Sequence, residues 1–534
     1  MDSLKWRGAV VVAFASLMTS SMSLAQHQPV DVLIKGGTIY DGTEGNKGFT
    51  GDVAFSGDKI VYVGPHFNVA AKRVIDAKGM IVSPGFIDGH SHGDMTFLAS
   101  SDPKKRQVPA WLMQGVSTMV IGVDGGAGSS GAPEISEQFD KYRQQGIGTN
   151  IVSFVGYAQV RRRVIGDEAR APTPSELATE KALVAKGMCE GAAGFSTGLF
   201  YTPQFFAKTD EIVELAKEAA KRGGIYDTHE RDEGAYSVGY IASTKEALQI
   251  GREAGLPVHF AHIKMLGPDV WGNAPKVVKM IEAARAAGQI VTADQYPYPS
   301  GETYLQAIVI PPWALDGGYT ALIKRFNDPV TMARIEADTN ATLKRIGAHS
   351  ILFTRYDQPW TGKYLDEIAK QWKVTPFEAA VRILRQSDQQ LVVIFFMRDD
   401  DIQYFMKQPW TMTGSDGAPG HPREYGTFPL KYTQYVKQRH TLSLPAFIHQ
   451  STGLPAEIYS LDRRGTLKAG NFADVLVFDP NRFTPKADYV HWDVLSEGVV
   501  DLLVNGKLAV DGGKMTVVLS GRPLPHAPKP NSCQ

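Results

Sequence analysis

Short apolar runs alternate with amphipathic stretches through the centre of the chain, a pattern typical of strands joined by helical crossovers. Residues 209–221 illustrate the helical part, because Ile212, Val213, Leu215 and Ala216 recur at helical spacing. Eight such strands predict an α/β fold with a (β/α)₈ TIM-like barrel, and the alternative is a doubly wound open sheet. Ligand-type residues at most strand ends favour the barrel, whose active-site face collects them. The eight candidate strands end near His92, Asp124, Tyr157, Thr197, His229, His262, Asp294 and Asp416.

Both ends of the chain differ from the centre in carrying short β-runs closed by glycine-rich turns. We expect residues 26–83 and 467–534 to build one small β-sandwich domain, with the barrel of residues 84–466 inserted between them. The connection from Tyr298 to Leu391 is too long for a βα loop. We therefore predict an inserted lid subdomain at about 299–350.

The N-terminus has the pattern of a secretory signal peptide. Lys5 and Arg7 precede an apolar run over 8–18, and small residues at 23–25 offer a cleavage site. A short membrane anchor is the alternative, but the run is shorter than the roughly 20 residues that span a bilayer. We expect cleavage of residues 1–25, a periplasmic or secreted location, and no membrane contact afterwards.

Composition excludes several classes of partner. The 534 residues are 43% hydrophobic, and 56 Lys plus Arg balance 56 Asp plus Glu. No net charge therefore attracts nucleic acid or an anionic membrane, and a small-molecule partner is expected.

Cys189 and Cys533 are the only cysteines, and Cys533 lies beside the C-terminal residue, so we expect no structural disulfide.

Histidines supply the candidate metal chemistry. His90 and His92 follow an apolar run and lie two residues apart, so in an extended strand both imidazoles face one side and reach one metal ion. His229 and His262 end two further candidate strands. The structural alternative for each is a buried core histidine. We interpret His259 as such a core residue or as a residue that supports the site without binding the metal.

Several separated motifs together resemble the amidohydrolase superfamily and, more narrowly, its N-acyl-D-amino-acid deacylases, or D-aminoacylases. The resemblance extends over nearly the whole chain after residue 25, in order. It is carried by FIDGHSH at 86–92, YDTHERDE at 226–233, AHIK at 261–264, GSDG at 414–417, GAAGFSTGL at 191–199, ADQYPY at 293–298, HPR at 421–423 and the segment 462–480.

The resemblance implies a zinc site. One tight Zn²⁺ is expected at Asp124, His229 and His262, with His90 and His92 forming a second, weaker site or shaping the first. Related deacylases have a cysteine where this chain has Asp124, a harder oxygen donor that selects zinc less strongly. A simple Asp-Gly turn is the alternative for that position. Residues 191–204 contain no lysine, which argues against hydantoinase-like and dihydroorotase-like centres bridged by a carboxylated lysine.

The resemblance also implies roles around the metal. Asp416 would accept a proton from water and pass it to the leaving amine, although Asp-Gly pairs also occur in ordinary turns. Arg423, Lys264 and Tyr296 would bind the substrate carboxylate, and Tyr201 would help to stabilise the oxyanion. Ordinary surface or supporting positions are the alternative for these four.

These features predict metal-dependent hydrolysis of N-acyl-D-amino acids to a carboxylate and a free D-amino acid, without an organic cofactor. A dipeptidase or carboxypeptidase-like amide hydrolase is the enzymatic alternative, and a metal-free binding protein on the same barrel is the other. The preference for D over L substrates rests on the resemblance alone.

Overall fold

The computed structural model describes residues 29–98, 100–126, 131–356 and 358–533. The expected signal peptide, residues 1–25, lies outside these ranges. Within them, every helix is too short or too polar to cross a membrane.

Parallel strands form the centre of the molecule in two sheets. A three-stranded sheet orders β6 (Phe86–Asp88), β7 (Val116–Ile121) and β8 (Asn150–Ser153). A six-stranded sheet orders β18 (Thr411–Thr413), β13 (Val291–Gln295), β12 (Val258–Phe260), β11 (Ile225–His229), β10 (Gly194–Gly198) and β9 (Val155–Gly156). Every pairing within them is parallel.

The two parallel sheets meet at both of their edges. One residue separates β8 from β9, and at the other side the Gly89 N–H donates to the Thr413 carbonyl over 3.1 Å. A parallel bridge also joins Ser91 to Gly417. The strands therefore follow one another around a common centre, with their carboxyl ends on one side.

Helices connect these strands, as the alternating pattern predicts. The helix expected over 209–221 is confirmed as α6 (Thr209–Lys221), which buries Ile212, Leu215 and Ala216. The others are α1 (Pro103–Arg106), α2 (Pro109–Leu112), α3 (Ile135–Gln145), α4 (Tyr157–Val164), α5 (Pro174–Cys189), α7 (Tyr240–Ala254), α8 (Ala274–Ala286), α14 (Asp399–Met406), α15 (Arg423–Leu430), α16 (Leu444–Ser451) and α17 (Gly453–Ile458).

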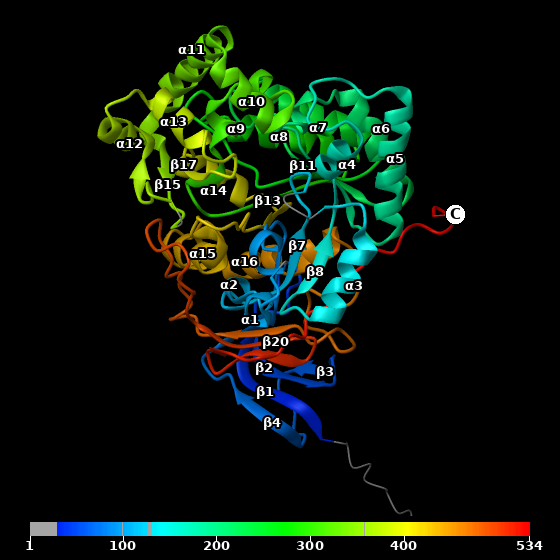
Figure 1. Cartoon of the computed structure of the whole chain (residues 1–534). Helices are drawn as coiled ribbons and strands as arrows, with labels where there is room; N and C mark the ends of the chain where they lie inside the picture. The colour runs from blue at the N-terminus through cyan, green and yellow to red at the C-terminus, as the bar shows by residue number, and fades with distance from the viewer. Residues whose placement is uncertain (1–28, 99, 127–130, 357, 534) are drawn as a thin grey trace, which may run out of the picture.

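Both ends of the chain share a nine-stranded sheet. Its two halves join where β5 (Ile81–Pro84) pairs antiparallel with β19 (Val475–Phe478). Figure 1 shows the blue N-terminal and red C-terminal strands together at one end of the molecule. The remaining strands are β1 (Val30–Ile39), β2 (Phe49–Ser56), β3 (Lys59–Gly64), β4 (Ala71–Asp76), β20 (Val499–Val504), β21 (Lys507–Asp511) and β22 (Lys514–Met515).

A separate unit, which we call the insertion, lies at the opposite end of the molecule (Figure 1). It begins at β14 (Ser300–Tyr304) and ends at β17 (Leu391–Phe395), which pair antiparallel. The predicted limits of about 299–350 were therefore too short, because the strand that pairs with β14 comes some ninety residues later. Between them lie α9 (Leu305–Val309), α10 (Gly318–Asn327), α11 (Pro329–Ile346), β15 (Ile351–Phe353), β16 (Lys363–Tyr364), α12 (Leu365–Trp372) and α13 (Pro376–Leu384).

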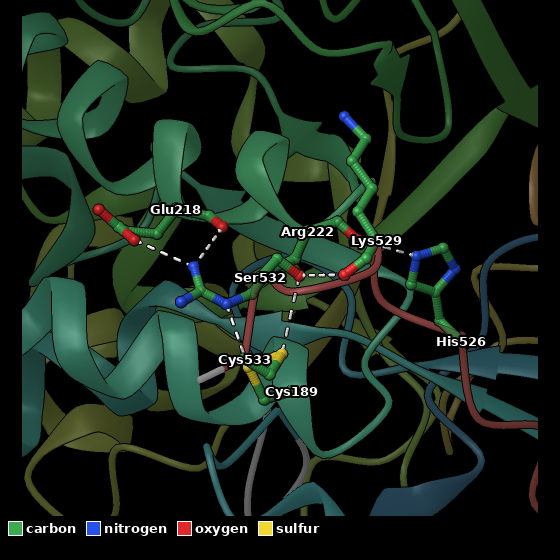
Figure 2. Close-up of a disulfide and its surroundings, with 7 residues drawn as sticks. All are labelled: Cys189, Glu218, Arg222, His526, Lys529, Ser532 and Cys533. Atoms are coloured by element: carbon green, nitrogen blue, oxygen red, sulfur yellow. Dashed lines mark hydrogen bonds and ion pairs between the residues drawn. A yellow bond between two sulfur atoms is a disulfide. The ribbon is translucent and has the colours of Figure 1, made fainter.

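The expectation of no structural disulfide was wrong, because Cys189 and Cys533 are bonded across 344 residues of sequence. The C-terminal tail, residues 520–533, leaves the nine-stranded sheet and runs along β8, where the Leu524 N–H donates to the Ile151 carbonyl over 2.8 Å. This path brings Cys533 to the last residue of α5 (Figure 2). The spacing of residues in the sequence indicated neither the Cys189–Cys533 bond nor the path of the tail away from the rest of the predicted 467–534 segment.

Candidate active site

Six side chains that we predicted to bind metal or transfer a proton lie close together at the carboxyl ends of the parallel strands. His90 and His92 follow β6, Asp124 follows β7, His229 ends β11 and His262 follows β12. Asp416 follows β18. Their ligand-type atoms form two groups that share Asp124, and within each group these atoms lie within 4.8 Å of one another. The groups are His90, His92, Asp124 and Asp416, and Asp124, His229 and His262.

Asp124 lies at the centre of the cluster. Its Oδ1 is 3.3 Å from His262 Nε2 and 3.6 Å from His90 Nε2. His229 Nδ1 lies 3.0 Å from His262 Nε2, and His92 Nε2 lies 3.2 Å from Asp416 Oδ1. The ring nitrogens of His229 and His262 and the carboxylate of Asp124 therefore lie close enough together to bind one metal ion.

The backbone at three of these residues is unusual. Asp124, His262 and Asp416 have φ of 55°, 34° and 47°, in the left-handed region that side-chain-bearing residues rarely adopt. Such conformations cluster at functional sites, where the surrounding structure holds them against their cost. Each of the three lies in the short turn that follows its strand and directs its side chain into the cluster.

The electrostatics of the cluster favour positive charge. Burial alone would lower the pKa of His92, but its contacts with Asp124 and Asp416 raise that pKa to about 9. Burial and Lys264 oppose protonation of His262, yet Asp124, Asp416 and Glu233 raise its pKa to about 9 as well. Carboxylates that hold protons on buried imidazoles also attract a divalent cation.

The residues present fit a metal ion. Among the described residues, both ring nitrogens of His90, Nε2 of His229 and Oδ1 of Asp124 are buried without a hydrogen-bond partner. Buried polar atoms are normally satisfied, so a group of unsatisfied donors and acceptors indicates a missing ligand. Neutral imidazole nitrogen and carboxylate oxygen are zinc ligands, although without a thiolate they discriminate less among divalent metals.

Asp416 joins this cluster to the expected carboxylate-binding residues. Its Oδ2 lies 2.8 Å from Arg423 Nη1, and the Arg423 guanidinium lies 4.6 Å from the centre of the Tyr296 ring. Lys264 Nζ donates to Glu233 Oε1 over 2.7 Å and lies 2.6 Å from His262 Nδ1. Lys264 and Arg423 therefore contact members of the cluster directly, and Tyr296 contacts Arg423.

Two cavities of unequal size meet at this point. The narrow cavity, of about 30 Å³, is lined by Lys264 and Tyr296. The wide cavity, of about 430 Å³, reaches His92 and Asp124. Both are also lined by Tyr201, Asp416 and Arg423. The predicted residue Tyr201 therefore stands between the cavities, where its hydroxyl accepts a hydrogen bond from Thr303 Oγ1 over 3.1 Å.

The sequence prediction missed three acidic residues that support the site. Glu233 Oε2 lies 3.4 Å from His229 Nε2, and Glu233 Oε1 lies 3.2 Å from His262 Nδ1. Although burial opposes ionisation, His229 and Lys264 lower the pKa of Glu233 to about 2, which keeps it anionic. Its place in the 226–233 motif was the available signal.

The other two acidic residues act on the backbone and on histidine orientation. Asp88 Oδ1 accepts from the Ser415 N–H over 2.8 Å and Oδ2 from Trp111 Nε1 over 2.6 Å, which fixes the turn before Asp416. Asp294 Oδ2 contacts Nε2 of His259 at 3.0 Å and Nδ1 of His90 at 3.5 Å. His259 thus supports the site through Asp294, at a distance from the candidate ligands.

Comparison with known proteins finds the chain similar to amidohydrolases over most of its length. The amidohydrolase family description matches residues 73–510. A D-aminoacylase of Alcaligenes xylosoxydans xylosoxydans is 32% identical, over 91% of this chain and 95% of that protein. N-acyl-D-glutamate deacylase of Bordetella bronchiseptica, solved with zinc and a phosphonate mimic of the tetrahedral intermediate, has a TM-score of 0.78 at 28% identity, covering 93% of this chain and all of that one.

A third similarity concerns the number of metals. A D-aminoacylase structure, described by the role of its binuclear metal centre with one-metal activation and second-metal attenuation, has a TM-score of 0.78. Its identity is 29%, and the match covers 93% of this chain and 100% of that one.

Proposed function

The chain belongs to the amidohydrolase family, and from this membership and the geometry of the site we propose that it hydrolyses N-acyl-D-amino acids. The products are a carboxylate and a free D-amino acid. One observation carries the proposal: Asp416 contacts the candidate metal ligand His92 with one oxygen and the candidate carboxylate receptor Arg423 with the other. A proton-transferring group is therefore positioned between the site of attack and the bound amino acid.

Zinc is the proposed cofactor. Asp124, His229 and His262 would hold one tight ion, while His90 and His92 would provide a second, weaker site. The zinc and the binuclear centre named for similar proteins support this assignment. When bound, zinc supplies Lewis acidity, which polarises a carbonyl group and makes a water molecule easier to deprotonate.

Asp416 would accept the proton of the attacking water and deliver it to the leaving nitrogen. Although burial opposes ionisation, Arg423 and His262 lower the pKa of Asp416, so the carboxylate is anionic and ready to accept at neutral pH. Its backbone N–H donates to the His90 carbonyl over 2.8 Å, which fixes the position of the side chain.

The narrow cavity would receive the amino-acid carboxylate. Lys264 and Arg423 bring positive charge to it, and the phenol of Tyr296, buried without a hydrogen-bond partner among the described residues, can donate a hydrogen bond. Tyr201 lines both cavities and would donate to the developing oxyanion.

The architecture and location complete the proposal. We propose that the two parallel sheets close into one eight-stranded barrel of residues 84–466, carrying the insertion as a lid. The nine-stranded sheet would be the expected small β-sandwich domain of 26–83 and 467–534, without the tail 520–533 that runs along β8. Disulfides form and persist in oxidising compartments. The Cys189–Cys533 bond therefore supports the proposal that residues 1–25 are cleaved and that the protein is periplasmic or secreted.

A substrate panel tests the function. We expect amine release from N-acetyl-D-amino acids by the zinc-loaded enzyme to exceed release from N-acetyl-L-amino acids, dipeptides and hydantoins. The reason is that two fixed points, the carbonyl and the carboxylate, leave only one configuration in which the side chain fits the surrounding walls. Faster cleavage of dipeptides or L-substrates would assign a different amide hydrolase, and activity retained after complete metal removal would refute the metal-dependent reaction.

A further inference from the structure

The two cavities that meet at Asp416 differ in volume, and this difference indicates which part of the substrate each can hold. An N-acyl amino acid extends in two directions from its scissile amide, toward the carboxylate and toward the acyl chain. Both cavities include Asp416 and Arg423, so a single substrate placed at Asp416 extends into both.

The narrow cavity accommodates only a compact group. A single water molecule needs about 10–15 Å³ of such space, so about 30 Å³ corresponds to roughly two water molecules. Lys264, Tyr296 and Arg423 line it and match a carboxylate. Its wall also includes the apolar residues Leu266, Ile308 and Ile394 and the carboxylates of Glu233, Glu302 and Asp416. The small volume leaves little room for a large side chain.

The wide cavity has a different composition along its length. Its base includes the polar residues His92 and Asp124, and the insertion contributes both apolar and polar residues to its walls. Its volume of about 430 Å³ falls in the range of pockets that enclose whole small-molecule ligands, roughly 300–1,000 Å³. The apolar walls include Ala307, Ile310, Leu315, Leu322 and Leu384.

Polar residues line this cavity at its base and also on the insertion, which contributes Glu302, Thr303 and Gln306. Arg162 is exposed, and Asp167 and Asp388 are half-buried, so these three mark the side that meets solvent. Leu322 and Leu384, at 1% and 0% exposure, belong to the core of the insertion and support the wall from within, whereas the half-buried Ala307 faces the cavity. An acyl chain anchored at the amide would meet Ala307, Ile310 and Leu315 along this cavity.

We propose that the wide cavity binds a long linear apolar acyl chain, so the preferred substrates are medium- or long-chain N-acyl-D-amino acids with a small side chain. This inference rests on the proposed function, since it takes the scissile amide to lie at Asp416. The insertion then determines specificity for the acyl group, while the parallel strands supply the chemistry.

Two substrate series test the proposal with zinc-loaded enzyme. The first varies the acyl group of D-alanine from acetyl through butanoyl, hexanoyl and octanoyl, and the second keeps acetyl and lengthens the D-side chain from alanine to norvaline, norleucine and 2-aminooctanoate. Burying one methylene contributes about 0.8 kcal/mol, which corresponds to roughly fourfold. We expect kcat/KM to rise by roughly two- to fourfold per methylene in the acyl series and to stay level or fall in the side-chain series.

A pair of variants links the effect to the cavity. Ala307→Phe adds a ring to the cavity wall on α9, whereas Ala337→Phe adds the same ring to the exposed surface of α11 in the same unit. Ala307→Phe should lower the octanoyl-to-acetyl ratio of kcat/KM at least tenfold, and Ala337→Phe should leave that ratio at the wild-type value.

The outcomes separate the inference from the function on which it rests. Cleavage of N-acetyl-D-alanine without any gain along the acyl series, or a gain along the side-chain series instead, overturns the inference and leaves the deacylase function intact. Absence of cleavage in both series refutes the proposed function. In that case calorimetric titration with N-octanoyl-D-alanine decides: binding that Ala307→Phe weakens supports the apolar-chain site, and absence of binding overturns it.

Discussion

Loss of the Cys189–Cys533 bond should destabilise the protein measurably and release its C-terminal tail. The bond closes a loop of 344 residues, for which the chain-entropy relation gives an upper value of about 6 kcal/mol at 25 °C. Removing native disulfides more commonly costs about 2–5 kcal/mol, so we expect about 3. Unfolding entropy of about 2.1 cal/mol/K per residue over 534 residues converts this to a Tm decrease of roughly 3 °C.

The tail gives a second, local readout of the same bond. Residues after 520 are held by a few backbone hydrogen bonds, such as His526 N–H to the Gly191 carbonyl at 2.9 Å and Lys529 N–H to the Arg222 carbonyl at 3.2 Å. These bonds alone leave the tail near the low-stability end of the structure. We expect limited proteolysis to remove it quickly once the bond is absent.

Calorimetry of the wild type with and without reductant measures the effect, and the double variant Cys189→Ser, Cys533→Ser is the control. The variant should match the reduced wild type and should not respond to reductant. Two free thiols titrated in the native oxidised chain, or a Tm and proteolysis pattern indifferent to reduction, would refute the reasoning.

Three further predictions concern buried charges. Asp416→Asn should retain zinc, measured by elemental analysis, but lose roughly 10²-fold or more in turnover, and parallel loss of zinc would mark it as mainly a ligand. Arg423→Ala should raise KM and also lower kcat, because it removes the partner 2.8 Å from Asp416; a pure KM effect in steady-state kinetics would contradict that coupling. Burial lowers the pKa of Lys431 from 10.5 to about 7, so the folded state binds fewer protons between these values. The unfolding free energy of the wild type relative to Lys431→Met should therefore rise with pH from 7 toward 10, and a flat difference in denaturant titrations would refute it.

The expected amidohydrolase membership is confirmed. It could be predicted from sequence because short local motifs and the local spacing of apolar residues carry that information. Helix α6 follows the spacing of Ile212, Leu215 and Ala216, and the parallel strands coincide with short apolar runs. Candidate ligands were readable because residues at the carboxyl end of a parallel strand face the common edge of the sheet. His229 and Asp416 both lie at such ends, and the resemblance to the amidohydrolases supplied their roles.

Contacts between distant segments were decided only by the tertiary structure. Sequence spacing does not measure spatial distance, so the bond from Cys189 to Cys533 and the pairing that extends the insertion to residue 395 were mispredicted. Glu233 was overlooked for the same reason, since its importance lies in contacts with His262 and Lys264. Residue types and their local periodicity determined which chemistry the chain carries. The packing of the insertion against the strand ends decided the two cavities, because their walls come from residues more than a hundred positions apart.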